Sequence, residues 1–192
     1  MIAKLRANLP NHIITSLNSP EYFIVDYKQI NGGSVMILSS NPIVPHIYIE
    51  NSDSVAIHFD GFLDNALEIS PGTCSRQCEC IVFPQTCNED DWILCAETKY
   101  VHNIENAFRE SNDYPNSMID QIIDTVNYFR AKNIIENNRR VTAIVSFPTL
   151  IEDFSASFFT GTPSIEDILI NNNIRIRATN SAQIISPKRI RI

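Results

Sequence analysis

Residues 92–99 read Trp-Ile-Leu-Cys-Ala-Glu-Thr-Lys, and this stretch decides the fold that the sequence predicts. Its first five residues are apolar, as in a buried strand, and its last three place an acid and a lysine at the strand's end. An earlier apolar run, residues 80–83 (Cys-Ile-Val-Phe), stops at Pro84, and the polar residues 88–91 lie between the two runs. Two apolar runs joined by a polar loop predict a β-hairpin.

Downstream of the hairpin, the pattern changes to that of an amphipathic helix followed by one more strand. Apolar residues recur at helical spacing from Met118 to Phe129, with charged residues on the other side, so we expect a helix over about residues 116–136. The β-branched run 140–147 ends at a proline and predicts a strand. Residues 78–147 therefore predict a compact α/β core.

The N-terminal part consists of short extended runs between turn formers, and we expect these runs to form a β-meander. A short helix is expected before them, at residues 3–8. Towards the C-terminus, residues 164–170 predict a short helix with Ser164 as its N-cap, and the alternating residues 174–177 predict an edge strand. The extended N-terminal runs are at residues 22–25, 35–38, 46–49 and 54–59.

Length and composition favour one globular domain of the α/β (α+β) class. The chain has 192 residues, of which 44% are hydrophobic and 19% charged, enough to bury a core. Within this single domain (1–192) we expect the core at about residues 54–147, a β-rich N-terminal region at 1–53 and a basic C-terminal segment at 174–192.

The charge pattern bears on partners and location. The formal net charge is −7, so overall charge gives no help in binding nucleic acid. No apolar run is long enough to cross a bilayer and no secretory h-region opens the chain, which favours a cytoplasmic protein without a membrane partner. A basic segment without acids stands out as a candidate for weak nucleic-acid binding, the alternative being a solvated edge. Its basic residues are Arg175, Arg177, Lys188, Arg189 and Arg191.

The residues with the clearest chemistry are at the end of the second hairpin strand. Alternation along a strand places Glu97 and Lys99 on one face. Such a carboxylate can hold a divalent cation while the lysine orients a water or neutralises a phosphate. Glu79, at the head of the preceding hairpin strand, is the candidate for a second metal-binding acid. The alternative is a plain surface ion pair.

These residues resemble a known family. Residues 78–83 and 92–100, with the following helix and strand, look like the active hairpin and the αβββαβ core of the PD-(D/E)xK (restriction-endonuclease-like) nuclease superfamily. The resemblance covers about 70 of the 192 residues. It implies a metal-dependent phosphodiesterase that usually cuts DNA with Mg²⁺ (or Mn²⁺), in restriction, repair or defence. It also implies that Glu97 is the metal-binding acid and Lys99 the catalytic lysine.

The sequence departs from the family pattern at two positions. Glu79 stands where the family most often has aspartate, and its longer side chain needs a shifted backbone to reach an octahedral Mg²⁺. Some members carry glutamine and, four residues later, tyrosine on the following helix, but here Gln121 is followed by Thr125. Further acids that could supply a ligand are Asp60, Asp64 and Glu68, and for each of them a surface role is the alternative.

Two other functions stay open. A catalytically inactive nuclease fold, or an immunity-type module, would bind a basic protein partner through its acidic surface, and a homodimer is also open. A zinc module is suggested by four of the five cysteines, although their spacing does not match paired zinc ligands and some of them fall on predicted strands. These four are Cys74, Cys78, Cys80 and Cys87.

Overall fold

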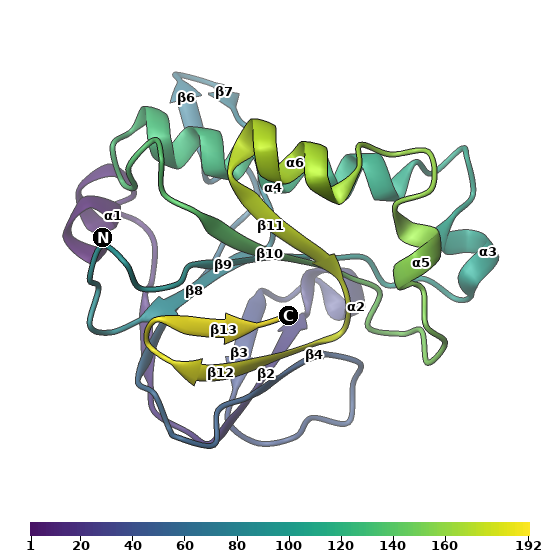
Figure 1. Ribbon diagram of the computed structural model, residues 1–192, viewed down its shortest axis with the longest axis horizontal. Coiled ribbons are helices and arrows are strands. Elements are labelled where there is room, and N and C mark those ends of the chain that lie inside the picture. The colour runs from purple at the N-terminus through teal and green to yellow at the C-terminus, as the bar shows by residue number, and fades with distance from the viewer.

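The computed structural model describes all 192 residues, and most of its strands form two sheets that face one another (Figure 1). The larger sheet has six strands, and its central strands include the hairpin predicted from the sequence. In spatial order the strands are β1 (Thr15–Leu17), β5 (Ile57–Gly61), β8 (Cys80–Pro84), β9 (Leu94–Thr98), β10 (Val141–Ser146) and β11 (Ile174–Ala178).

Helices connect the parallel strands of this sheet. β5, β8 and β9 pair antiparallel in chain order, whereas β10 and β11 are parallel to β9. A parallel neighbour requires a crossover, and α4 (Tyr114–Ala131) makes the one from β9 to β10. α6 (Ile165–Asn172) belongs to the crossover into β11, and both helices lie along the same face of the sheet (Figure 1). The shorter helices are α1 (Ile2–Asn8), α2 (Lys28–Asn31), α3 (Ile104–Ala107) and α5 (Ser155–Phe158).

The smaller sheet has five strands and covers the other face of the larger one (Figure 1). It combines strands from both ends of the chain, and a separate two-stranded hairpin lies outside both sheets. In spatial order the five strands are β13 (Arg189–Arg191), β12 (Ser181–Ser186), β4 (Ile47–Glu50), β2 (Glu21–Asp26) and β3 (Val35–Leu38), and the hairpin consists of β6 (Glu68–Ser70) and β7 (Thr73–Cys74).

The expected N-terminal meander is wrong, although its strands exist. β4 pairs with β2 and not with its chain neighbour β3, while β5 belongs to the larger sheet. The physical reason is that residues 22–26 of β2 are buried on both faces, which is the pattern of a central strand and not of a meander's edge. β12 adds to β4 in parallel, so the C-terminal segment completes the N-terminal sheet.

Alternation along the central strands builds two cores. Ile81 and Cys95 face α4 in the larger hydrophobic cluster, whereas Cys80, Val82 and Leu94 face the smaller sheet in the second cluster. Every residue of β8, β9 and β10 is buried, because both faces are covered. This explains the continuous apolar runs in the sequence and leaves charged residues only where a strand ends.

The long helix begins and ends earlier than predicted. α4 begins at Tyr114, with Pro115 in its first turn, and ends at Ala131, not near residue 136. Asn133 has φ of +54°, a left-handed conformation that asparagine tolerates and that terminates a helix. Ile134 and Ile135 then turn back into the core, so they continue the apolar pattern without continuing the helix.

The remaining element predictions are confirmed. The helix expected at 3–8 is α1, and the helix expected at 164–170 is α6, capped by Ser164 Oγ, which accepts from Asp167 N at 3.0 Å. β11 is an edge strand in which exposed and buried residues alternate. The chain is thus an α+β protein, and none of its helices has the length and apolar character needed to cross a bilayer.

Candidate active site

The hairpin brings Glu79 and Glu97 to the same end of the larger sheet. The paired register ends where Cys80 pairs with Ala96, and Glu79 directly precedes Cys80 while Glu97 directly follows Ala96. Glu79 N donates to Ala96 O at 3.0 Å, so the ladder becomes irregular at this end. The charge of Glu79 adds to the raised pKa of the Glu97 carboxyl, so the two carboxyl groups lie near one another.

Lys99 completes the group that the sequence singled out. Its Nζ donates to Glu97 Oε1 at 2.5 Å, as expected for two residues on one strand face. Lys99 N donates to the carbonyl of Ser146, so the backbone continues to follow β10 beyond the strand's last residue. Glu97 is 0% exposed and its Oε2 has no hydrogen-bond partner. A buried carboxylate with one free oxygen is therefore available at this end of the hairpin.

The structure adds a lysine that the sequence reading missed. Lys28, the first residue of α2, makes an ion pair with Glu79 through Nζ and Oε2. The same ammonium contacts Asp64 Oδ1 at 3.2 Å and donates to Phe62 O at 3.5 Å. Two carboxylates thus each pair with a lysine at the site: Lys28 from α2 with Glu79, and Lys99, directly after β9, with Glu97.

A network from Asp26 holds this added segment in place. Asp26 is fully buried, and its Oδ1 accepts from Lys28 N at 3.0 Å. Gln29 donates to Asp26 Oδ2 and, at 2.9 Å, to the carbonyl of Thr98, and it accepts from Tyr100 N at 3.2 Å. The backbone of β9 is therefore bound on one side by the α2 segment.

A sequence signal for these residues exists. Residues 23–28 read Phe-Ile-Val-Asp-Tyr-Lys, and residues 94–99 read Leu-Cys-Ala-Glu-Thr-Lys. Both stretches place an acid, any residue and a lysine after an apolar strand. The structure brings the two stretches together, with Thr98 Oγ1 donating to Asp26 Oδ2 at 3.5 Å.

Burial dominates the electrostatics of the two glutamates. It raises the pKa of the Glu97 carboxyl to about 8, with Lys99 opposing the rise and Glu79 adding to it. Burial also raises the pKa of Glu79, with Asp26 adding and Lys28 opposing. Burial alone would lower the pKa of the Lys99 ammonium, but the neighbouring carboxylates outweigh burial, so the pKa of Lys99 is raised. The carboxyl pKa values are of the kind that marks functional sites.

The donor set fits an open magnesium site and not a closed one. No group of three or more histidine, cysteine, aspartate or glutamate side chains converges to hold a metal ion. Mg²⁺, however, is commonly held by one or two carboxylates, with waters and substrate phosphates completing its octahedron. Glu79 and Glu97, with the unpartnered Oε2 of Glu97, meet that smaller requirement.

The other acids and the helix glutamine have separate partners. Asp60 is buried and bonded to His12 Nδ1 at 2.8 Å. Glu68 accepts from Gly72 N in the small hairpin, whereas Asp64 reaches the site through Lys28. Gln121 donates to the carbonyl of Gln77 at 2.9 Å, and so it supports the chain just before Glu79.

The cysteines do not form a zinc module. Cys78 and Cys80 are both buried but belong to the two different cores. Residues two apart in a regular strand share a face, and the alternation is interrupted at Glu79, whose backbone N donates to Ala96 O. All five cysteines are free thiols, and they are absent from any metal-holding group. Burial raises the pKa of Cys78 and Cys80 well above the ordinary thiol value, so both behave as small apolar residues.

The basic C-terminal residues lie apart from the two glutamates. Arg175 and Arg177 are exposed on β11, and the register places Arg177 beside Ile144, which faces the smaller sheet. Glu97 has the opposite parity and faces α4. Arg189 and Arg191 are exposed on β13, and Lys188 forms an ion pair with Asp90.

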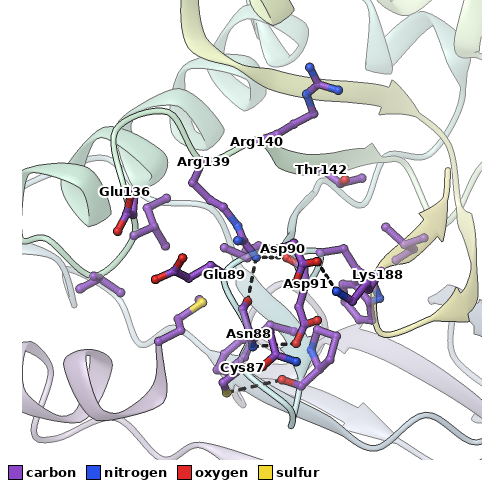
Figure 2. Close-up of a pocket in the computed structure, with 18 of the residues that line it drawn as sticks. Cys87, Asn88, Glu89, Asp90, Asp91, Glu136, Arg139, Arg140, Thr142 and Lys188 are labelled. Carbon is purple, nitrogen blue, oxygen red and sulfur yellow. Dashed lines mark hydrogen bonds and ion pairs between the residues drawn. The ribbon is translucent and has the colours of Figure 1, made fainter.

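A pocket of about 730 Å³ lies at the other end of β8, β9 and β10, where Pro84, Ile93 and Thr142 line it. Figure 2 shows this pocket. Arg175, Lys188 and Arg189 are among its lining residues. Arg139 reaches across it to the carbonyls of Asn88 and Asp91 (Figure 2). Its arginines and lysines are interspersed with acids, so the pocket has no single sign of charge.

Comparison of the chain with protein-family models, with curated proteins and with solved structures finds no match.

Proposed function

We propose that this protein is a magnesium-dependent phosphodiesterase of the PD-(D/E)xK type that acts on DNA. The observation that carries the proposal is the group formed by Glu79, Glu97 and Lys99. Two acids lie near one another at the same end of one hairpin, and a lysine contacts one of them. A chance Glu-x-Lys on a strand surface would lack the second acid and the burial.

The order of the elements also supports the proposal. Helix α1 is followed by the antiparallel strands β5, β8 and β9, then by α4 and the parallel strand β10. This is the order expected for an αβββαβ core, with the acids on its second and third strands. Strand β1 and the smaller sheet are additions to that order.

The roles of the residues follow from their positions. A magnesium ion held by Glu79 and Glu97 would polarise the scissile phosphate and lower the pKa of an attacking water. Lys99, fixed against Glu97, places an ammonium where negative charge develops on the phosphate or on the attacking oxygen. Burial of Glu97 excludes bulk water around these charges, which strengthens their interaction with a phosphate.

The test is cleavage of plasmid and oligonucleotide DNA with Mg²⁺ or Mn²⁺ by the parent protein and by Lys99→Ala. We expect the variant to lose at least about a hundredfold in rate, the scale of removing one charge-stabilising group. Lys132→Ala is the control, since Lys132 lies beyond the last turn of α4 and its ammonium packs over the ring of Tyr128. Cleavage by Lys99→Ala at the parental rate would refute the role of Lys99.

A second candidate is a nuclease-like fold that binds a basic protein and has no catalytic activity. Two observations favour it: the net charge of −7, and the pairing of each glutamate with a lysine. An acidic protein attracts a basic partner over a long range. Absence of metal binding, together with stable binding to a basic protein, would select this candidate over the enzyme.

A further inference from the structure

The ammonium group of Lys28 is surrounded by oxygen atoms at the candidate site. It contacts three of them: Oε2 of Glu79, Oδ1 of Asp64 and the backbone carbonyl of Phe62. An ammonium has three N–H donors, so the number of surrounding oxygens equals the number of its donors. Carboxylate and carbonyl oxygens are also the ligands that hard divalent cations take.

The lysine is built into the site and is not a loose surface side chain. Its side chain is only 20% exposed. Its backbone is fixed by Asp26, and the next residue, Gln29, is bound to the carbonyl of Thr98. These contacts tie the start of α2 to the end of β9, one residue from Glu97. The ammonium is therefore held at Glu79 by the fold of the smaller sheet.

Charge balance shows what the ammonium does there. Four carboxylates approach the site, from Asp26, Asp64, Glu79 and Glu97, and two ammonium groups oppose them, from Lys28 and Lys99. Oε2 of Glu79 has one such positive partner, and a divalent cation bound at the same oxygen would lie within a few ångströms of the ammonium. Two positive charges at that distance repel strongly in a partly buried site, so Lys28 and a divalent cation oppose one another at this oxygen.

We propose that the Lys28 ammonium occupies the cation position at Glu79, so that Mg²⁺ or Mn²⁺ binds only in competition with it. This inference rests on the proposed function, because it assumes that the two glutamates are the metal ligands. Lys28 is then a positioning residue of the site. It keeps Glu79 neutralised when no metal is bound, and metal entry requires it to move off that carboxylate.

The test is calorimetric titration of the metal-free protein with Mn²⁺ and with Mg²⁺, without DNA. We expect Lys28→Met to bind Mn²⁺ at least about tenfold more tightly than the parent, because a unit charge near the ligands opposes the metal strongly. Lys28→Arg keeps the charge and should bind as the parent does. Lys188→Met removes an ion-paired lysine at the far end of the strands and should leave the affinity within about twofold.

The outcomes separate this inference from the proposed function. If the parent binds Mn²⁺ and Lys28→Met binds equally or more weakly, competition by Lys28 is refuted while the metal site stands. If neither binds, the metal site itself is refuted, and the inference with it. The double variant Lys28→Met/Glu79→Gln should lose the gain in Mn²⁺ affinity that Lys28→Met brings. Urea denaturation of each variant shows whether the measured affinities are those of folded protein.

Discussion

Glu97 is fully buried, and of its two carboxyl oxygens only Oε1 has a hydrogen-bond partner. Burying a carboxylate so sparsely bonded is costly, and a group in this position holds a proton to a higher pH than usual. Burial accordingly raises its pKa to about 8, with Lys99 and Lys28 opposing and Glu79 adding to the rise. At the scale of single residues, the site therefore reduces stability in its ionised form, as functional sites often do.

This predicts a pH dependence of stability. Since the folded-state pKa of Glu97 lies above its ordinary value of 4.5, the folded protein retains a proton that the unfolded chain releases. The stabilisation that comes from this retained proton is fully present below the ordinary pKa of a glutamate, and it is lost as the pH rises through about 8. Glu79, with its raised pKa, acts in the same direction.

The measurement is urea denaturation with EDTA present, at several pH values between about 5 and 8.5, for the parent and Glu97→Gln. The amide cannot ionise, so the free energy of unfolding of the parent should fall relative to the variant as the pH rises. Parallel curves for the two proteins over this range would contradict the assignment of a raised pKa to Glu97.

At the scale of elements, α4 fixes the start of β8 and so the position of Glu79. Thr125 Oγ1 accepts from Cys78 N at 2.8 Å and donates to the carbonyl of Gln121 at 2.8 Å. Gln121 in turn holds the carbonyl of Gln77. Gln121, and Thr125 at the position where the glutamine–tyrosine pattern has tyrosine, therefore anchor the residues that precede Glu79.

Replacing Thr125 by valine keeps the shape of the side chain and removes its hydrogen bonds. Cys78 N is then left unpaired in the core, and we expect unfolding free energy to fall by about 1–3 kcal/mol. Urea denaturation measures this loss. Thr142→Val is the matched control, because Thr142 lines the open pocket on β10, and should change stability by less than about 0.5 kcal/mol. Equal effects of the two changes would refute the anchoring role.

The same elements show how far the sequence alone could predict the fold and the site. The hairpin and α4 were predictable because their signals are local: continuous apolar runs, a polar loop and helical periodicity. The pairing of β2 with β4, and the approach of Asp26 to Thr98, were not. The latter residues are 72 positions apart, and nothing in either local pattern specifies the other. Lys28 was missed for this reason, although its acid-x-lysine spacing repeats that of residues 97–99.

At the scale of the whole molecule, the exposed arginines of β11 are separated from the two glutamates and their lysines. Glu97 has the parity of the β9 residues that face α4, whereas these arginines lie on the other side of the same sheet. Arg175 shares the large pocket with Lys188 and Arg189, so the edge strands β11 and β13 bring their basic residues near one another. A polyanion bound along this edge would be held by its phosphates and would not need the glutamates.

If β11 follows the phosphate backbone of DNA, the double variant Arg175→Gln/Arg177→Gln should lower affinity without changing the chemical step. Each phosphate contact adds about 0.9 to the slope of log affinity against log salt, so we expect this slope to fall by roughly 1–2 in fluorescence-anisotropy titrations. The cleavage rate at saturating DNA should stay within about twofold, because neither arginine shares the face of Glu97 and Lys99. Lys132→Gln, beyond the last turn of α4, is the control for loss of a positive charge elsewhere on the protein. An unchanged slope would show that this basic edge is only solvated and that DNA is held elsewhere.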